Sequence, residues 1–338
     1  MSGILVWGTG FPGLAEETSP DLLQRSVSSM SELSKGAFDI SDLAPWFEFS
    51  LVCEGPQSRC WLSSKRWDGP PLIISGSCSS SLDLAWHFHR LGLCTVWSSV
   101  LALSQWAGRG QFGRTWQSPP GNIYAAWCLP DPPKPWAGML SLLVGYMIIQ
   151  GLMDAKVEVQ LKWPNDLLIR GKKVGGILIE ARGDAFIAGV GINLVSSPAK
   201  LQFDDPHALS PTSLKAEYGF STSPLALWTR LVQIGQSCYR KAISDKTGYI
   251  SSAIPISSGM GTEEFISRLQ PHMAFMGEEV IVDDYHGRKS GAGSYLARIV
   301  GLDQSGGLLI WASGKEKVIR SGRIYPLKEK GIYEKKNF

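Results

Sequence analysis

The most informative stretch of the sequence is Gln105-Trp-Ala-Gly-Arg-Gly-Gln-Phe-Gly-Arg-Thr-Trp116. Seven consecutive positions, from Gly108 to Arg114, hold three glycines and two arginines. Glycine lets the backbone approach a ligand closely and adopt a positive φ, and arginine presents a fixed fork of N–H donors to carboxylate or phosphate oxygens. The stretch therefore predicts a loop that binds an anionic ligand.

The spacing Gly108-x-Gly110-x-x-Gly113 also matches the dinucleotide-binding fingerprint, which requires a strand before it and a helix after it. The residues that follow are Arg-Thr-Trp-Gln-Ser-Pro-Pro-Gly. Two consecutive prolines cannot continue a helix, because each lacks the N–H that the helix needs. The sequence therefore disfavours an NAD-binding turn.

Three further motifs begin about 50 residues downstream, at Leu161-Lys-Trp-Pro-Asn-Asp-Leu167, Lys172-Lys-Val-Gly-Gly-Ile-Leu-Ile-Glu180 and Gly189-Val-Gly-Ile-Asn193. The ordered set G-R-G-x-x-G-R-x-W, K-W-P-N-D, K-x-x-G-I-L-x-E and G-x-G-I-N closely resembles the biotin protein ligases. The resemblance covers roughly residues 75–195 strongly and the C-terminal β region weakly.

The resemblance implies an ATP-dependent reaction in two steps. Biotin and ATP form biotinyl-5′-adenylate, and biotin then passes to a lysine of a biotin carboxyl carrier protein. Cationic donors offset the repulsion between a carboxylate and a triphosphate, and a loop that closes over the adenylate excludes water. Mg²⁺ would be carried by ATP, with no metal site of the protein's own. A lipoate or octanoate ligase, a biotin-sensing DNA-binding regulator and a nucleotide-binding protein without ligase activity remain alternatives.

The resemblance also assigns site residues. Arg109 and Lys173 would bind the biotin carboxylate and the α-phosphate, and Asp166 would orient the acceptor lysine, so these three are the expected catalytic residues. The expected biotin site is formed by Ser80, Ser81, Leu82, Gln105, Gly108, Arg109, Gly110, Gln111 and Lys173. The expected ATP and adenylate site is formed by Arg114, Trp116, Asn165, Lys173 and Asn193.

Several of these residues have simpler structural explanations. Ser80 could act only as a helix cap, and Lys162 and Lys173 could be structural or surface charges. Where the family usually shows Ser-Thr-Asn, this chain has Ser80-Ser81-Leu82. Since leucine cannot replace the amide, the contacts at that end of biotin would differ.

The hydrophobic pattern mixes helices and strands and so predicts an α+β catalytic domain with a mixed sheet over residues 71–268. Helices are expected at 79–92, 224–242 and 263–269, and a buried rather than membrane-spanning helix within the uncharged run 135–153. Strands are expected at 72–75, 93–98, 123–128, 157–161, 176–180 and 185–190. Short β segments at 278–283, 293–302, 307–311 and 317–320 predict a small SH3-like barrel in a C-terminal domain over 269–338.

Charge and composition limit the classes of partner that we expect the protein to bind. The 338-residue chain has a net charge of only +3, too small to indicate a nucleic-acid or membrane partner. Residues 1–70 form a segment of unknown role, and up to residue 65 they hold eight acidic and four basic side chains, the wrong sign for a DNA-binding winged helix. The six cysteines show no C-x-x-C pair and the first residues lack a secretory signal, so we expect reduced thiols and a cytoplasmic protein. The oligomeric state stays open, with a homodimer among the alternatives.

Overall fold

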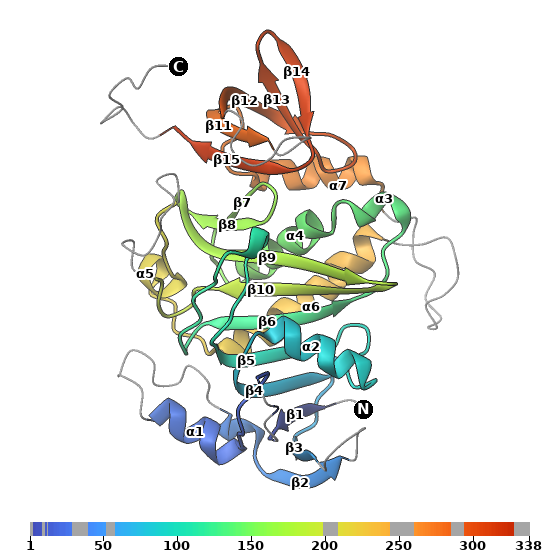
Figure 1. Ribbon diagram of the computed structural model, residues 1–338, viewed down its shortest axis with the longest axis vertical. Coiled ribbons are helices and arrows are strands. Elements are labelled where there is room, and N and C mark those ends of the chain that lie inside the picture. The colour runs from blue at the N-terminus through green and yellow to red at the C-terminus, as the bar shows by residue number, and fades with distance from the viewer. Residues whose placement is uncertain are drawn as a thin grey trace.

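The computed structural model describes residues 3–8, 11, 13–28, 40–51, 58–198, 209–243, 260–284 and 294–327. Its main strands are β1 (Ile4–Trp7), β2 (Trp46–Leu51), β3 (Ser58–Ser63), β4 (Leu72–Cys78), β5 (Ser99–Gln105), β6 (Ile123–Leu129), β7 (Gln160–Lys162), β8 (Asp166–Ile169), β9 (Lys172–Arg182) and β10 (Ala185–Ile192). They form one ten-stranded sheet in the order β2-β3-β1-β4-β5-β6-β10-β9-β8-β7 (Figure 1). β4 pairs in parallel with β1 and β5, and the other pairs are antiparallel. The predicted mixed α+β sheet is confirmed.

Helices cover both faces of this sheet. They are α1 (Pro20–Ser28), α2 (Ser81–Arg90), α3 (Lys134–Ala137), α4 (Leu140–Asp154), α5 (Leu214–Tyr218), α6 (Pro224–Ala242) and α7 (Thr262–Leu269). Figure 1 shows α2 on one face, against β5, β6 and β10, and the paired helices α4 and α6 on the other. Two hydrophobic clusters result, one on each side of the sheet.

The central strand β6 shows why both faces are buried. Its seven residues, Ile-Tyr-Ala-Ala-Trp-Cys-Leu, are all buried, and their side chains alternate between the two clusters, as a strand's geometry requires. Trp127 packs toward α6, where a Cβ on Gly235 would lie 2.4 Å from the indole ring. Glycine at this position therefore lets the helix approach the tryptophan.

The uncharged run at 135–153 folds mainly into α4, with α3 before it. Ten of the fifteen residues of α4 are buried, and the helix packs against β9, β7 and α6. The predicted buried helix is confirmed. No helix in the described ranges is both long and apolar enough to cross a membrane.

The segment before residue 70 adds to the sheet. Strand β1 inserts between β3 and β4, with Ile4 opposite Leu72, and β2 forms the edge beyond β3. The sequence boundary near residue 70 therefore lies within one continuous sheet.

The C-terminal strands are β11 (Glu279–Asp284), β12 (Tyr295–Leu302), β13 (Leu308–Ala312), β14 (Lys315–Ile319) and β15 (Gly322–Pro326). They form an antiparallel sheet in the order β14-β13-β12-β11-β15. Within residues 279–284 and 294–327, β14 and β15 are its two edges, so the sheet is open there and the closed SH3-like barrel stays a prediction. The connection between β12 and β13 contacts the segment between β7 and β8 of the main sheet, since Trp163 Nε1 donates to the Gly306 carbonyl at 3.1 Å.

One predicted strand was wrong, and several strands were missed. Residues 93–98 form a loop with a turn at 96–97, where Trp97 has a φ of 71°, and the strand begins only at Ser99. The sequence patterns did not predict β1, β2, β3, β5, β8 or β15. Among the cysteines, Cys60, Cys78, Cys94, Cys128 and Cys238 are free thiols, and Cys53 lies outside the described residues.

Candidate active site

The site is built on one face of the antiparallel pair β9 and β10. Gly176 lies opposite Gly191, and Leu178 lies opposite Gly189. Because side chains alternate along a strand, these four residues point to the same side of the sheet. We call this surface the glycine face.

Two large side chains cover the glycine face. A Cβ on Gly189 would lie 2.6 Å from Leu82, and a Cβ on Gly191 would lie 2.7 Å from the Trp116 indole. Both distances are too short for any larger residue. Leu82 and Trp116 can therefore pack here only because residues 189 and 191, in the G-x-G-I-N motif, are glycines.

At one end of the glycine face lies a cluster of three charges, which we call the lysine cluster. Lys162 ends β7, Asp166 begins β8 directly opposite it, and Asp166 also pairs in register with Gly176. The Asp166 carboxylate accepts from Lys162 Nζ at 3.0 Å and from Lys173 Nζ at 2.5 Å. The side chains of Lys162, Asp166 and Lys173 are 10%, 15% and 28% exposed, so the cluster is largely shielded from water.

The electrostatics of the lysine cluster favour a permanent negative charge on Asp166. Burial alone would raise the pKa of this carboxyl group, but the two ammonium groups outweigh it and hold the pKa well below its usual range. The cluster therefore keeps a formal charge of +1, which suits an anionic ligand.

Two asparagines stand beside the lysine cluster. Asn165 donates through Nδ2 to the Ile177 carbonyl at 2.6 Å, and Asn193 donates to the Thr212 carbonyl at 3.0 Å. Asn193 Oδ1 and Trp116 Nε1 are buried and have no hydrogen-bond partner within the described part of the chain. Since buried polar atoms are normally paired, an acceptor and a donor are left for a ligand here.

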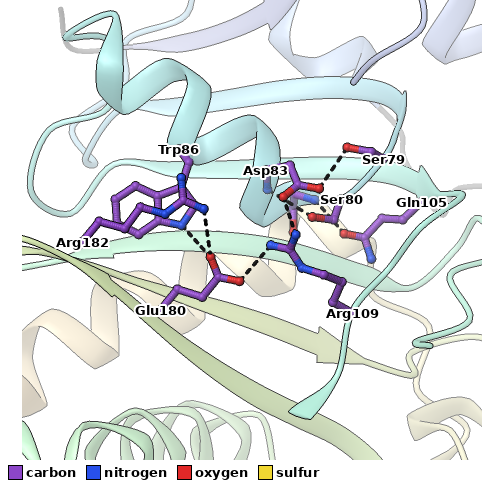
Figure 2. A network of polar contacts seen from close by, with 9 residues as sticks. Ser79, Ser80, Asp83, Trp86, Gln105, Arg109, Glu180 and Arg182 are labelled. Carbon is purple, nitrogen blue, oxygen red and sulfur yellow. Dashed lines mark hydrogen bonds and ion pairs between the residues drawn. The ribbon is translucent and has the colours of Figure 1, made fainter. Parts of the chain in front are cut away.

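At the other end lies Arg109, held between two carboxylates (Figure 2). Its guanidinium donates to Asp83 Oδ1 at 2.6 Å and to Glu180 Oε1 at 2.8 Å. Trp86 Nε1 also donates to Glu180, at 2.7 Å, and Arg182 stacks 4.4 Å from the Trp86 ring while pairing with the same carboxylate at 3.6 Å. We call these five residues the arginine network.

The first turn of α2 faces the same end. Ser80 is the N-cap, since its Oγ accepts from the Asp83 N–H at 3.1 Å. The Ser81 N–H donates to Gln105 Oε1 at 2.7 Å, and Gln105 Nε2 donates to Ser118 Oγ at 2.7 Å. Gln105 thus connects the helix N-terminus to the end of the glycine-rich loop.

The loop itself is a compact turn. The Trp116 N–H donates to the Gly108 carbonyl and the Gly110 N–H donates to the Arg114 carbonyl, at 2.8 and 2.7 Å. Gly113 has a φ of 71°, a left-handed conformation that glycine adopts without strain. Gln111 is half-buried and Arg114 is exposed at the loop's tip.

Apart from Gln111 and Arg114 in the loop, the expected site residues therefore lie together around the glycine face, with two differences from expectation. The guanidinium of Arg109 is occupied by carboxylates, whereas the lysine cluster supplies the free positive charge. Asp83 and Glu180 were not expected as site residues, although Asp83 lies within the predicted helix 79–92 and Glu180 is the last residue of the K-x-x-G-I-L-x-E motif. Because both residues are far from Arg109 in the sequence, no sequence pattern indicated that they pair with it.

A family model supports the motif assignment. The model for the Biotin/lipoate A/B protein ligase family matches residues 76–195. A biotin--[acetyl-CoA-carboxylase] ligase of Paracoccus denitrificans is 35% identical over 138 residues, which are 37% of this chain and 55% of that protein. A bifunctional ligase/repressor BirA of Bacillus subtilis is 39% identical over 107 residues, 29% of this chain and 33% of that protein.

A solved structure extends the likeness beyond the motifs. A biotin protein ligase from Aquifex aeolicus, in complex with biotin and ATP, superimposes with a TM-score of 0.59 and 25% identity. The match covers 76% of this chain and 98% of that one. The chain thus resembles biotin protein ligases in both its motifs and its fold. It spans about half or less of the length of the first curated ligases that it matches.

Proposed function

We propose that this biotin protein ligase homologue activates biotin with ATP to biotinyl-5′-adenylate and transfers biotin to a lysine of a biotin carboxyl carrier protein. The observation that carries the proposal is the lysine cluster at the end of the glycine face, beside the unpaired atoms of Trp116 and Asn193. Around this cluster lie the four sequence motifs that the family shares.

The chemistry requires positive charge where two anions meet. In the first step a biotin carboxylate oxygen bonds to the α-phosphorus of ATP and pyrophosphate leaves. Lys173, with Lys162 beside it, would neutralise the carboxylate and the α-phosphate. Because Asp166 fixes both ammonium groups before substrate arrives, little reorganisation is needed during the reaction.

The nucleotide would lie toward Trp116 and Asn193. An adenine ring offers both amino donors and ring-nitrogen acceptors, which complement the unpaired Asn193 Oδ1 and Trp116 Nε1. Asn165 and the exposed Arg114 complete the proposed nucleotide-binding set.

Biotin would lie along the glycine face toward the first turn of α2. The proposed biotin-binding residues are Ser80, Ser81, Leu82, Gln105, Gly108, Arg109, Gly110, Gln111 and Lys173. Leu82 presents an apolar surface there, packed on Gly189, in place of the amide that the family usually carries. Backbone groups and the serine hydroxyls would then supply the polar contacts.

In the second step the carrier's lysine nitrogen bonds to the biotinyl carbonyl carbon and AMP leaves. Asp166 would orient the incoming amine rather than remove its proton, because a carboxylate with so low a pKa is a weak base. Mg²⁺ would enter with ATP as part of the substrate. Within the described ranges there is no group of three or more His, Cys, Asp or Glu side chains that could hold a metal ion.

The shared family model makes a lipoate or octanoate ligase the second candidate. A DNA-binding regulator has less support, since the matched repressor shares only a third of its length with this chain. The described N-terminal strands also belong to the main sheet. A cytoplasmic location and an SH3-like C-terminal domain are part of the same proposal.

The test is pyrophosphate release by the full chain with MgATP and either biotin or lipoate, followed by mass spectrometry of a carrier domain. We expect release with biotin and a carrier mass increase of one biotinyl group, absent when the acceptor lysine is replaced by arginine. Activation of lipoate but not biotin would overturn the choice of substrate.

A further inference from the structure

Residues 210–212 run beside the beginning of β9, where Lys173 lies. The Lys173 N–H donates to the Ser210 carbonyl, and the Thr212 N–H donates to the Lys173 carbonyl, both at 2.9 Å. Both polar groups of the Lys173 main chain are therefore held by a segment that lies outside the sequence motifs.

Thr212 is buried, with 5% of its surface exposed, and it uses all three of its polar groups. Besides its N–H, its carbonyl accepts from Asn193 Nδ2 at 3.0 Å and its Oγ1 donates to Glu217 Oε1 at 2.7 Å. A single threonine thus connects the main chain of Lys173 to the side-chain amide of Asn193.

Glu217, in α5, fixes the hydroxyl of Thr212. Its side chain is 7% exposed and also accepts from Lys172 Nζ at 2.8 Å and from Arg170 at 3.2 Å. The hydrogen bonds from Lys172 and Thr212 lower the pKa of this carboxyl group, so Thr212 donates to a charged acceptor. Because a β-branched side chain has few χ1 rotamers, this bond also restrains the main chain at Thr212.

The Thr212 carbonyl sets the orientation of the Asn193 amide. It accepts from Nδ2, and the opposite orientation would place Oδ1 against another acceptor. Oδ1 is thereby directed away from Thr212, and it is buried with no hydrogen-bond partner among the residues that the structure describes. Thr212 therefore determines that Asn193 offers an acceptor, rather than a donor, to a ligand.

We propose that Thr212, fixed by Glu217, is a positioning residue for the formation of biotinyl-5′-adenylate. It keeps the Lys173 ammonium group and the Asn193 amide oxygen in a set relation, one for the α-phosphate and the other for the adenine. The proposal rests on the proposed function for these substrates. In that step a carboxylate oxygen bonds to the α-phosphorus and the bond from this phosphorus to the leaving pyrophosphate oxygen breaks. Thr212 acts on the step only through its two neighbours, and a displacement of about 1 Å in such groups can slow a reaction about 100-fold.

The first test is pyrophosphate release by the full chain at varied ATP concentration. Thr212→Val removes the hydroxyl at nearly constant volume, and we expect kcat to fall about tenfold and KM for ATP to rise about fivefold. Thr212→Ser keeps the hydroxyl and should restore both parameters to within about threefold. A loss of folded protein would lower kcat alone. An unchanged KM for ATP in Thr212→Val, or a serine variant no better than the valine variant, would overturn the proposal.

Thr95→Val is the matched control. Thr95 Oγ1 lies 3.2 Å from Ser98 Oγ, beyond the C-terminal end of α2 and so at the opposite end of that helix from the site. Its loss should leave kcat and KM for ATP within about twofold, as expected for a hydroxyl contact outside the site. Changes as large as those of Thr212→Val would mean that the loss of any threonine hydroxyl has the same effect, and would contradict the proposal.

The second test asks whether Glu217 acts through Thr212. We expect Glu217→Leu to reproduce the kinetic changes of Thr212→Val, and the double variant to be no slower than Glu217→Leu alone. If the two effects multiplied, the residues would act independently and the proposed pairing would be wrong.

The third test needs no catalysis. In hydrogen-exchange mass spectrometry of a peptide covering 170–176, we expect Thr212→Val and Glu217→Leu each to speed exchange about fivefold, because the bonds that hold the Lys173 main chain are loosened. Unchanged exchange in both variants would overturn the positioning role, and Glu217→Leu decides the matter if Thr212→Val does not fold. Faster exchange in a chain whose unmodified form releases no pyrophosphate with biotin would reject the proposed function while retaining the structural role of Thr212.

Discussion

Both ends of the glycine face hold ion pairs, but the charged groups are arranged differently at each end. At one end a single carboxylate, Asp166, stands between two lysines, and the group is shielded from water. At the other end a single arginine, Arg109, stands between two carboxylates, and its side chain is 38% exposed. The first arrangement leaves an uncompensated positive charge, whereas in the second the charge of Arg109 is compensated by carboxylates of the protein.

This difference shows that neighbouring carboxylates determine how much of a basic side chain's charge is already compensated within the protein. The identity of the opposing carboxylates decides its role. The lysine cluster has one more cation than anion, whereas in the arginine network Arg109 and Arg182 balance Asp83 and Glu180. Substitutions at the two ends should therefore affect different steps.

The largest effect should follow from removing Lys173. We expect Lys173→Ala to slow pyrophosphate release at saturating ATP about 100-fold or more, because a fixed charge aimed at the reacting phosphate is lost. The measurement is coupled-enzyme detection of pyrophosphate.

The neighbouring lysine provides a matched control. Lys172 pairs with Glu217 at 2.8 Å rather than with Asp166. Lys172→Ala should therefore keep its rate within about twofold, because the Lys172 side chain is 49% exposed and Glu217 keeps its ion pair with Arg170. A Lys173→Ala variant as active as Lys172→Ala would remove the lysine cluster from the active site.

A smaller effect, on stability, should follow from Asp166→Asn. It leaves two shielded ammonium groups without their carboxylate, and we expect unfolding free energy at pH 7 to fall by about 2–3 kcal/mol. The folded-state pKa of Asp166 lies below its ordinary value of 3.8, so its stabilising effect is present above about pH 4 and is lost as pH falls below that. The difference from the unmodified chain in urea unfolding should accordingly shrink from pH 7 toward pH 3.

Asp154→Asn is the control for that experiment. Asp154 forms an ion pair with Arg230, and both side chains are about half exposed. The loss should stay below about 0.5 kcal/mol. Equal losses in the two variants would show that the lysine cluster is no better shielded than a surface pair.

Local sequence patterns predicted the helices whose formation depends mainly on their own residues. The helix beginning after Ser80 has a cap and a stop signal, and α6 begins at a proline after a capping serine. The helix within 135–153 follows from its apolar composition alone. Each of these features lies within a few residues of the element that it specifies.

The missed elements depend on partners far away in sequence. Strand β1 has only four residues and exists by pairing with β3 and β4. Residues 93–98 alternate like a strand, yet the left-handed Trp97 turns the chain before β5. The motifs located the site, but not the pairing of Arg109 with Glu180, because 71 residues separate the two and no local signal selects that carboxylate.

The smallest effect concerns Ser80, which the structure shows capping α2 beside the arginine network. We expect Ser80→Ala to lower the unfolding free energy by about 1 kcal/mol, whereas Ser80→Asn should preserve it, because asparagine is an equally good cap. Urea unfolding of the two variants measures this. Calorimetric titration with biotin then separates the two proposed roles, since a serine that also contacts biotin should lose affinity in both variants. If Ser80→Asn kept full affinity as well as full stability, Ser80 would be a cap alone, and binding at this end would fall to Ser81 and the backbone.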